Sequence, residues 1–479
     1  MNATAPQAST LRRITLAPLF VLVRWLAGRL VTVFYREVKQ TGRQRVAAQT
    51  PLLIAANHPN SIMDPIVLMT SFERPVHFLA RAGLFRFGPV RWLLETFHAI
   101  PVQRRQDGGD MGANASMFAA THAVFERGGV VGIFPHGHNV EERKIDPIRS
   151  GAARIALGAE AAHGWSLGLQ IVPVGMNYED RDRLASRVLI HWGEPIVVAD
   201  YAQGYARAPR ETAAALTQEL LQRMRHCAVH LTEAVDRDVH ERVRQVYAHQ
   251  LHRDLIGDEQ TLEDRFFLER RIGEAIAWGR EAIPERAQRL VETIQAHTTL
   301  MDRVHLRERV FRGGQAEQKL RRRAVSSTLR MFAGLPFALW GYAHNALPYH
   351  LTRLSARLAP EAAIIAVTAF GAGILWFGLW YSAVGYALYV LTGGALWVLV
   401  YGVSIPGSGL FALGYLRWLR RVRHELLAGL ILRRRPALLE RLRRERVAIL
   451  EELDELRDQF VEETGGELTA YLAKRSSEP

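Results

Sequence analysis

Residues 57–64 read Asn-His-Pro-Asn-Ser-Ile-Met-Asp and directly follow the apolar run from Leu52 to Ala56. Because that run predicts a buried strand, an imidazole (His58) and a carboxylate (Asp64) leave the strand end together. Histidine titrates near about 6.5, and a carboxylate bonded to one ring nitrogen fixes the tautomer and makes the other nitrogen more basic. Such a pair could take a proton from an alcohol. The alternative is a loop histidine beside a helix-capping aspartate, and the spacing alone does not decide between them.

The spacing between the two residues constrains the local structure. Six steps along an α-helix turn the chain by about 600°, so His58 and Asp64 cannot share one helix face. Pro59 favours a turn after His58, and Asn60 or Ser61 could cap the helix that follows. We therefore expect Asp64 to point back at the imidazole from the first turn of that helix.

Three further segments of the chain complete an ordered set. Residues 99–105 read Ala-Ile-Pro-Val-Gln-Arg-Arg, residues 134–138 read Phe-Pro-His-Gly-His, and residues 171–175 read Ile-Val-Pro-Val-Gly. Together with residues 57–64 they resemble the four blocks of the glycerophospholipid acyltransferases: Asn-His-x4-Asp, Gly-x-Ile-Pro-Val-x-Arg, Phe-Pro-Glu-Gly and Val-Pro-Val. The matching residues are Asn57, His58, Asp64, Ile100, Pro101, Val102, Arg104, Phe134, Pro135, Gly137 and the run from Ile171 to Gly175.

The resemblance covers roughly residues 45 to 200. The extra residue between His58 and Asp64 and the long apolar region downstream are similar to a subgroup that includes the fungal dual-specificity glycerol-3-phosphate and dihydroxyacetone-phosphate acyltransferases. The resemblance implies that His58 deprotonates an acceptor hydroxyl, which attacks an acyl thioester, while Asp64 orients the ring. The co-substrate would be acyl-CoA or acyl carrier protein, and no other cofactor is expected.

An acceptor that carries a phosphate needs cationic partners, and guanidinium groups bind phosphate oxygens bidentately. Arg104 is the first candidate from its motif position. Arg81 is the second, because it stands where many relatives have a lysine, and Arg105 and Lys144 are weaker candidates. Acceptor identity stays open: glycerol 3-phosphate or dihydroxyacetone phosphate is slightly favoured, with lysophosphatidate close behind.

The third block departs from the family pattern, because His136 stands where the family has glutamate. Any polar contact expected of that carboxylate is therefore in question, although Gly137 still allows close backbone approach to a ligand. His136 and His138 together with His58 could instead suggest a metal site, but a His-x-His pair without a cysteine or acidic cluster is a loose signal. We expect no metal. A second function stays open, namely a non-catalytic lipid-binding or scaffolding protein with a degenerate acyltransferase fold.

The chain is strongly basic, with 61 Lys and Arg against 48 Asp and Glu and a formal net charge of +13. This balance fits nucleic acid, anionic lipid or an acidic substrate. We expect no nucleic-acid partner, because no base-reading motif is present and the arginines border apolar segments. The lone Cys227 excludes an internal disulfide, and we expect it to serve packing.

A membrane region is predicted from the stretch Ala362 to Leu416, which contains no charged residue and no histidine. It could hold two spans, roughly Ala362–Tyr381 and Val384–Val403. Its flanks are basic on both sides, so both ends and the active site are expected on the cytoplasmic face. The alternative is an apolar hairpin buried in protein or a re-entrant pair.

Two other apolar segments are expected at the membrane surface. Ile14–Tyr35 is broken by Arg24 and Arg29, which predicts an interfacial helix whose arginines meet lipid phosphates. Phe332–Tyr349 contains two prolines and is expected to be an interface helix or a part-span.

Short apolar runs alternate with helical stretches, which predicts an α/β domain with a mixed sheet covered by helices. The expected strands are Leu52–Ala56, Val76–Ala80, Val130–Phe134, Ile171–Gly175 and Val188–Trp192. The expected segments are an N-terminal interfacial helix (1–45), an acyltransferase domain (46–205), a helical insertion or lid (206–320), a membrane region (321–420) and C-terminal charged helices (421–479). The last segment could form a coiled coil, within the chain or between chains, so an oligomer is possible.

Overall fold

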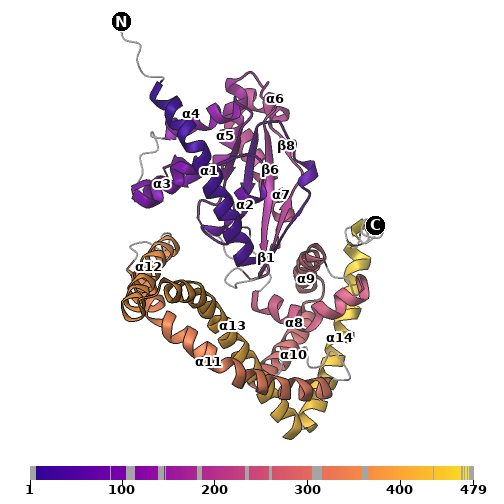
Figure 1. The fold of residues 1–479 in the computed structure, drawn as a ribbon. Helices are drawn as coiled ribbons and strands as arrows, with labels where there is room; N and C mark the ends of the chain where they lie inside the picture. Colours follow the sequence, from indigo (N-terminus) through magenta and orange to yellow (C-terminus); the bar gives the residue numbers. More distant parts are fainter. Residues whose placement is uncertain are drawn as a thin grey trace. The chain divides into compact units, whose positions relative to one another are not determined.

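The computed structural model describes residues 7–86, 88–103, 114–138, 145, 147–180, 186–231, 237–257, 261–304, 316–358, 365–434, 436–464, 466, 468, 470, 471 and 473. It divides into two compact units (Figure 1). The sheet unit comprises Met1–His240, Ala248–Ala282 and Gly466–Pro479, and the helical unit comprises Glu241–Tyr247 and Ile283–Gly465. Each unit is described by itself.

Within the described residues, the sheet unit contains an eight-stranded mixed sheet, as predicted. The strands are β1 (Tyr35–Thr41), β2 (Leu52–Ala56), β3 (Val76–Arg81), β4 (Ile100–Val102), β5 (Val130–Ile133), β6 (Gln170–Tyr178), β7 (Ser186–Trp192) and β8 (Ile196–Val197). Their order is β1-β7-β6-β2-β5-β3-β4, and β8 pairs with β6. Strands β2 to β6 run parallel, whereas β7 is antiparallel to β6.

Helices cover both faces of this sheet (Figure 1). Alternate residues of β2 point to opposite faces, so Leu53 and Ala55 pack in one core while Leu52 and Ile54 pack in the other. Helices α4 (Asn114–Phe125), α5 (Gly151–Ala162) and α7 (Pro209–Cys227) cover the first face. Helices α1 (Gln7–Phe34) and α2 (Met63–Ser71) lie on the second. Short helices α3 (Gly88–Thr96) and α6 (Ala202–Arg207) complete this unit's N-terminal part.

The N-terminal segment differs from the interfacial helix predicted for residues 1–45. After α1 the chain forms β1, which pairs in parallel with β7. This strand was not predicted, because its charged residues interrupt the apolar pattern. Arg24, expected to meet lipid phosphates, instead donates to the carbonyls of Phe72 and Glu73 at the end of α2. Exposed apolar side chains do line α1, namely Val21, Leu22, Trp25, Leu26 and Leu30.

The predicted insertion 206–320 is divided between the two units. Helix α7 packs on the sheet, and α9 (Leu262–Ala282) also belongs to the sheet unit, whereas α10 (Pro284–Arg303) belongs to the helical unit. Helix α8 (Arg237–Leu255) contributes residues to both. Phe266 of α9 packs with Leu189 of β7. Beside this apolar contact, Glu179 pairs with Arg187 at 3.1 Å and also with Arg265 of α9.

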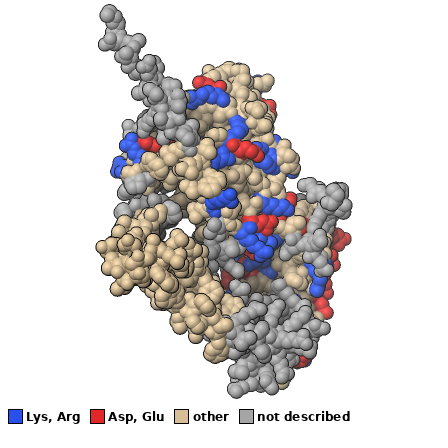
Figure 2. All heavy atoms as spheres, viewed as in Figure 1, with Lys and Arg blue, Asp and Glu red and all other residues tan. Residues whose placement is uncertain are grey.

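The helical unit is built around α11 (Ala316–Arg357), α12 (Ile365–Thr392) and α13 (Ala395–Arg434), which pack against one another. Among the described residues, Gly371–Thr392 and Ala395–Leu416 are long and apolar enough to cross a membrane. Only 6% and 18% of their most apolar stretches are buried, and the face of these helices seen in Figure 2 carries no charged side chain. Most of these two stretches is therefore exposed among the described residues, and the alternatives of a hairpin buried in protein or a re-entrant pair stay open.

The break between the two apolar helices lies about ten residues later than predicted. The helix ends at Gly393, which has φ 64° and donates its N–H to the Tyr389 carbonyl at 2.8 Å. A glycine in the left-handed region is a common helix end, and the predicted turn near Tyr381 offers no such residue. The predicted part-span Phe332–Tyr349 lies inside α11, which continues through Pro336 and Pro348.

The proline-containing helix α11 is joined to α12 by a specific hydrogen bond. Pro348 has no N–H for the carbonyl of His344, four residues earlier, so that carbonyl loses its partner within the helix. The indole Nε1 of Trp380 in α12 donates to it at 2.8 Å. Tyr381 adds a second link, because its hydroxyl donates to Asn345 at 2.5 Å. In an apolar bundle such bonds satisfy backbone groups that lipid could not.

The C-terminal helix α14 (Pro436–Thr464) packs on α10 of the same chain. Arg286 donates to Glu452 at 3.2 Å and to Glu455 at 2.6 Å, and Met301 packs against Leu442. Part of the apolar face that could have formed an intermolecular coiled coil is thus used within the chain. An oligomer stays a prediction.

The Glu179 ion pairs predict a pH-dependent stability of the sheet unit. Burial alone would raise the pKa of Glu179, but its hydrogen bonds and charge interactions with Arg187 and Arg265 outweigh burial and lower the pKa to about 2. The ion pairs therefore stabilise the fold above the ordinary carboxyl pKa of 4.5, and this contribution is lost as pH falls toward about 2.

We expect Glu179→Gln to lower the melting temperature at pH 7. The difference in melting temperature between this variant and the natural protein should shrink as pH falls below 4.5, down to the lowest pH at which both proteins stay folded. Thermal melts followed by near-ultraviolet circular dichroism measure this gap. Glu194→Gln is the matched control, because Glu194 is 67% exposed and forms an exposed ion pair with Arg45, which contributes about 0–1 kcal/mol. A pH-independent gap for Glu179→Gln would contradict the prediction.

Candidate active site

The motif residues that follow β2 and β5 lie at one edge of the sheet. Strands β2, β3, β4 and β5 are parallel, so their carboxyl ends lie at the same edge. His58 follows β2, Arg81 ends β3, and residues 134–137 follow β5. The carboxyl edge of a parallel sheet is where α/β folds usually place their ligands.

His58 and Asp64 form the predicted pair. The ring nitrogen Nδ1 of His58 lies 2.9 Å from Oδ2 of Asp64. The Asp64 side chain is fully buried, whereas the His58 side chain is 19% exposed. Asp64 lies in the first turn of α2, as expected. Because Asp64 can only accept when ionised, Nδ1 carries the proton and Nε2 presents its lone pair.

The start of helix α2 differs in detail from the prediction. Its N-cap is Ile62, and neither Asn60 nor Ser61 caps it through a side chain. Instead the backbone N–H of Asn60 donates to Oδ2 of Asp64 at 2.7 Å, and the Asn60 carbonyl accepts from the N–H of Met63 at 2.9 Å. Ser61 takes φ 45° to make this tight turn. The turn thus serves to hold Asp64 rather than to cap the helix.

Tyr178 is a site residue that the sequence did not reveal. Its hydroxyl donates to Oδ1 of Asp64 at 2.6 Å, from the carboxyl end of β6. Burial, and then the nearby charge of Asp64, raise the pKa of Tyr178 well above its ordinary value, so the phenol stays a neutral donor. Among the described residues, Asp64 therefore accepts hydrogen bonds from three groups, those of His58, Asn60 and Tyr178.

Two aromatic rings fix the plane of the imidazole. The His58 ring stacks on Phe134, with centroids 4.0 Å apart and planes 13° apart. Phe134 in turn stacks on Phe78 of β3, with centroids 5.6 Å apart. The stacking leaves His58 little freedom to rotate. The phenylalanine of the third block therefore contacts the His58 imidazole directly.

Other motif residues support the backbone of this edge. The amide of Asn57 donates to the Met176 carbonyl at 3.2 Å and accepts from the Met176 N–H at 2.6 Å, which joins β2 to β6 beyond their last strand pair. Pro101 lies in β4 opposite Ala80. Asn114 binds the backbone of Gln103 in the same two-sided way, at 2.9 and 3.1 Å, where β4 ends.

The third block turns sharply after Pro135. Gly137 has φ 76°, a conformation that favours glycine, and its N–H donates to the Phe134 carbonyl at 3.0 Å. His136, which replaces the family glutamate, is 1% exposed, and its ring centroid lies 6.4 Å from that of His138. No group of three His, Cys, Asp or Glu side chains that could hold a metal occurs in the part of the chain that the structure describes.

Of the four candidates for phosphate binding, the structure describes only Arg81. Arg104, Arg105 and Lys144 lie outside the described residues. Arg81 is the last residue of β3, opposite Val102, at the same sheet edge as His58. Its role in phosphate binding stays a prediction.

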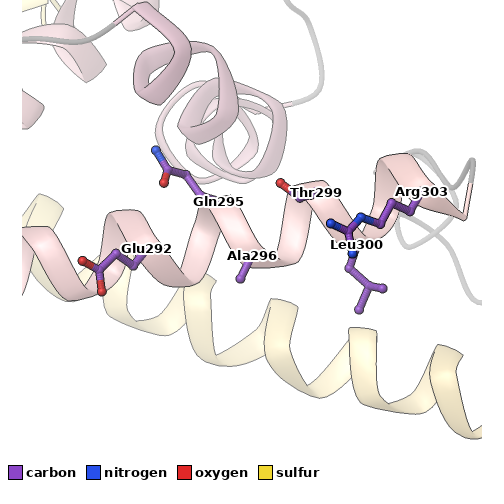
Figure 3. Close-up of a pocket in the computed structure, with 6 residues that line it drawn as sticks. All are labelled: Glu292, Gln295, Ala296, Thr299, Leu300 and Arg303. Atoms are coloured by element: carbon purple, nitrogen blue, oxygen red, sulfur yellow. The ribbon is translucent and has the colours of Figure 1, made fainter.

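Two other features lie apart from the His58–Asp64 pair in the chemistry they offer. Cys227 is buried, and burial raises the pKa of its thiol to about 12, so it cannot supply a thiolate near neutral pH. The pocket of Figure 3 is lined by residues of α10 alone, in the helical unit. Its lining residues, Glu292, Gln295, Ala296, Thr299, Leu300 and Arg303, include no histidine or cysteine.

Comparisons with known proteins match the part of the chain that carries His58 and Asp64. Residues 37–177 match the acyltransferase family model. The chain is 25% identical over 265 residues to glycerol-3-phosphate O-acyltransferase 1 of Saccharomyces cerevisiae, covering 38% of this chain and 35% of the relative. It is 27% identical over 195 residues to 1-acyl-sn-glycerol-3-phosphate acyltransferase of Bacillus subtilis, covering 39% of this chain and 86% of the relative.

Among solved structures, the 1-acyl-sn-glycerophosphate acyltransferase of Thermotoga maritima aligns with a TM-score of 0.31 and 16% identity, over 44% of this chain and 81% of that one. The matched region of this chain spans about a third of the yeast relative's length.

A mixed sheet whose parallel strands end in a His–Asp pair, matched by the acyltransferase family model over the same residues, defines an acyltransferase-type domain. Residues 37–177 carry this acyltransferase domain, and the chain is similar to glycerol-3-phosphate and 1-acyl-sn-glycerol-3-phosphate acyltransferases.

The three-donor arrangement predicts the effect of removing the Tyr178 hydroxyl. Tyr178→Phe leaves the buried Asp64 carboxylate with one donor fewer, so we expect a loss of about 1.5–3 kcal/mol in the free energy of unfolding. Tyr201→Phe is the matched control, because its hydroxyl binds the half-buried Glu219 away from this site. Denaturant unfolding of both purified variants measures the difference. Equal losses would mean that Tyr178 has no special role in holding Asp64.

Proposed function

We propose that this protein is a membrane-bound acyltransferase that moves a fatty acyl chain from a thioester to a hydroxyl of a glycerol-phosphate acceptor, in phospholipid synthesis. The observation that carries this proposal is the His58–Asp64 pair, 2.9 Å apart, at the carboxyl edge of the sheet. The names of the relatives support glycerol 3-phosphate or lysophosphatidate as the acceptor class. Acyl-CoA or acyl carrier protein would supply the acyl chain.

In this mechanism His58 acts as general base. The acceptor hydroxyl gives its proton to Nε2 of His58, and its oxygen attacks the carbonyl carbon of the thioester. The tetrahedral intermediate collapses by breaking the carbon–sulfur bond, and the thiolate takes the proton from His58. The products are an ester and a free thiol, and no covalent enzyme intermediate forms.

The surroundings of His58 suit this task. Asp64 is bonded to Nδ1, so it holds the tautomer in which Nε2 can accept a proton and it stabilises the imidazolium that forms. Asn60 and Tyr178 keep Asp64 in place, and Phe134 fixes the ring. Since the thioester is already activated, positioning and proton removal are the main demands on the protein.

The main test is His58→Ala, assayed with radiolabelled acyl-CoA and glycerol 3-phosphate, dihydroxyacetone phosphate and lysophosphatidate. We expect turnover to fall by at least about 100-fold, the usual contribution of a general base. His226→Ala is the matched control, because His226 is exposed and its side chain bonds only the backbone carbonyl of Gln222 among the described residues. Unchanged turnover in a folded His58→Ala protein would rule out this base.

A non-catalytic lipid-binding protein is the second candidate, favoured by the buried His136 at the position of the family glutamate. The same assay decides between the two. Absence of product from the natural protein with every acceptor, at saturating donor and acceptor, would favour this second function.

The proposal includes insertion in a bilayer, with the active site on the cytoplasmic face. Leu375 and Leu379 of α12 are 54% and 55% exposed in an uncharged stretch. Such exposure is costly in water and is satisfied by lipid. The arginines on both sides of the region support the orientation.

We expect the double change Leu375→Lys and Leu379→Lys to reduce the fraction of protein that resists an alkaline carbonate wash of membranes, because each lysine places a charge in the apolar stretch Gly371–Thr392, at a cost that reaches about 2.5–3.5 kcal/mol at a span centre. The double change Leu375→Ala and Leu379→Ala is the control for lost volume. Complete release of the natural protein by the same wash would contradict insertion.

A further inference from the structure

Arg149 contacts the turn of residues 134–137, whose Phe134 stacks on His58. It belongs to none of the four motif blocks. Its backbone N–H donates to the carbonyl of Pro135 at 3.0 Å, which ties the segment before α5 to the third block. Its guanidinium lies over Gly137. A Cβ added to Gly137 would be 3.6 Å from both Cζ and Nε of Arg149 and 3.7 Å from Nη1.

The strand order makes this turn the nearest one to His58 on that side of the sheet. Strand β5, which leads into the turn, is the direct neighbour of β2. Strand β3 lies two positions from β2 in the sheet, and β4 lies three positions from it. Neighbouring strands lie about 4.8 Å apart, so the ends of β5, β3 and β4 are about 5, 10 and 14 Å from the end of β2. The stacking of His58 on Phe134, in the same turn, confirms this proximity.

The chemistry of the acceptor suits a cation at this distance. In glycerol 3-phosphate only the three-carbon backbone separates the reacting hydroxyl from the phosphate, so a hydroxyl at His58 leaves the phosphate one or two strands away. Arg149 is exposed, so a soluble or lipid-borne phosphate can reach it. A guanidinium can donate two parallel hydrogen bonds to phosphate oxygens.

We propose that Arg149 binds the phosphate monoester of the acceptor and makes the site selective for phosphorylated alcohols. The inference rests on the proposed acyl transfer and assigns a residue to one part of it. Arg81, at the end of the next strand, is placed to bind the same group from the far side of β5.

The first experiment measures binding without turnover. Isothermal titration calorimetry with glycerol 3-phosphate is carried out on the natural protein, Arg149→Gln, Arg149→Lys and Arg154→Gln, all full length in detergent micelles. We expect Arg149→Gln to weaken binding by about 10- to 100-fold, the loss of a charged hydrogen-bonding pair, and Arg149→Lys to weaken it less. Arg154→Gln is the matched control, since Arg154 is also exposed but lies over the Phe118 ring at 5.8 Å.

The second experiment measures selectivity. Acyl transfer to glycerol 3-phosphate is compared with acyl transfer to glycerol. Acyl transfer to lysophosphatidate is compared with acyl transfer to monoacylglycerol. Arg149→Gln should raise KM for both phosphorylated acceptors and leave the KM of the acyl donor and the rates with the unphosphorylated acceptors unchanged. A KM change for only one phosphorylated acceptor would identify the soluble or the lipid-borne phosphate as the ligand.

The outcomes separate this inference from the proposed function. Equal glycerol 3-phosphate affinity in the natural protein and a folded Arg149→Gln would overturn the role of Arg149, whether or not the protein turns over. An equal loss of acyl transfer to phosphorylated and unphosphorylated acceptors in Arg149→Gln would show that Arg149 has only a structural role. That result would also overturn the proposed phosphate binding. Loss of acyl transfer in His58→Ala together with unchanged selectivity in Arg149→Gln would leave the function intact and reject Arg149 alone.

Discussion

The site depends on one buried carboxylate. Asp64 is fully buried, and a charge in that position is tolerated only when donors surround it. The donors come from the His58 ring, the turn at Asn60 and the far end of β6 at Tyr178. Strand β2, helix α2 and strand β6 must therefore all be in place before the imidazole acquires its orientation. The orientation of the His58 ring therefore depends on the fold of the sheet as a whole.

The parallel strands explain why residues far apart in the sequence act together. Strands β2, β3, β4 and β5 are parallel and end at the same sheet edge, so their order sets the lateral position of the described groups that follow them relative to His58. The aromatic stack from Phe78 through Phe134 to His58 joins residues of three neighbouring strands or their ends. It holds the plane of the His58 ring. Paired amide contacts of Asn57 and Asn114 hold the strand ends themselves.

Local signals in the sequence predicted much of this. The apolar runs gave β2, β3, β5, β6 and β7, and the spacing after Pro59 gave the His58–Asp64 contact. Strand β1 was missed because its charged residues mask the alternation, and its pairing with β7 joins residues about 150 positions apart. Tyr178 and Arg149 were missed for a related reason: each acts through a contact made only by folding, with no local pattern. The apolar composition predicted two membrane helices, but the glycine pair at 393–394 set their boundary.

The bond from Trp380 to the His344 carbonyl has a consequence for biogenesis. Pro348 leaves that carbonyl exposed in α11, and a bare carbonyl in hydrocarbon is costly. In the bilayer insertion proposed above, α11 would carry this cost until the indole of α12 is in place. Under that proposal the two helices enter lipid as a single unit, and a chain cut between them keeps a bare carbonyl.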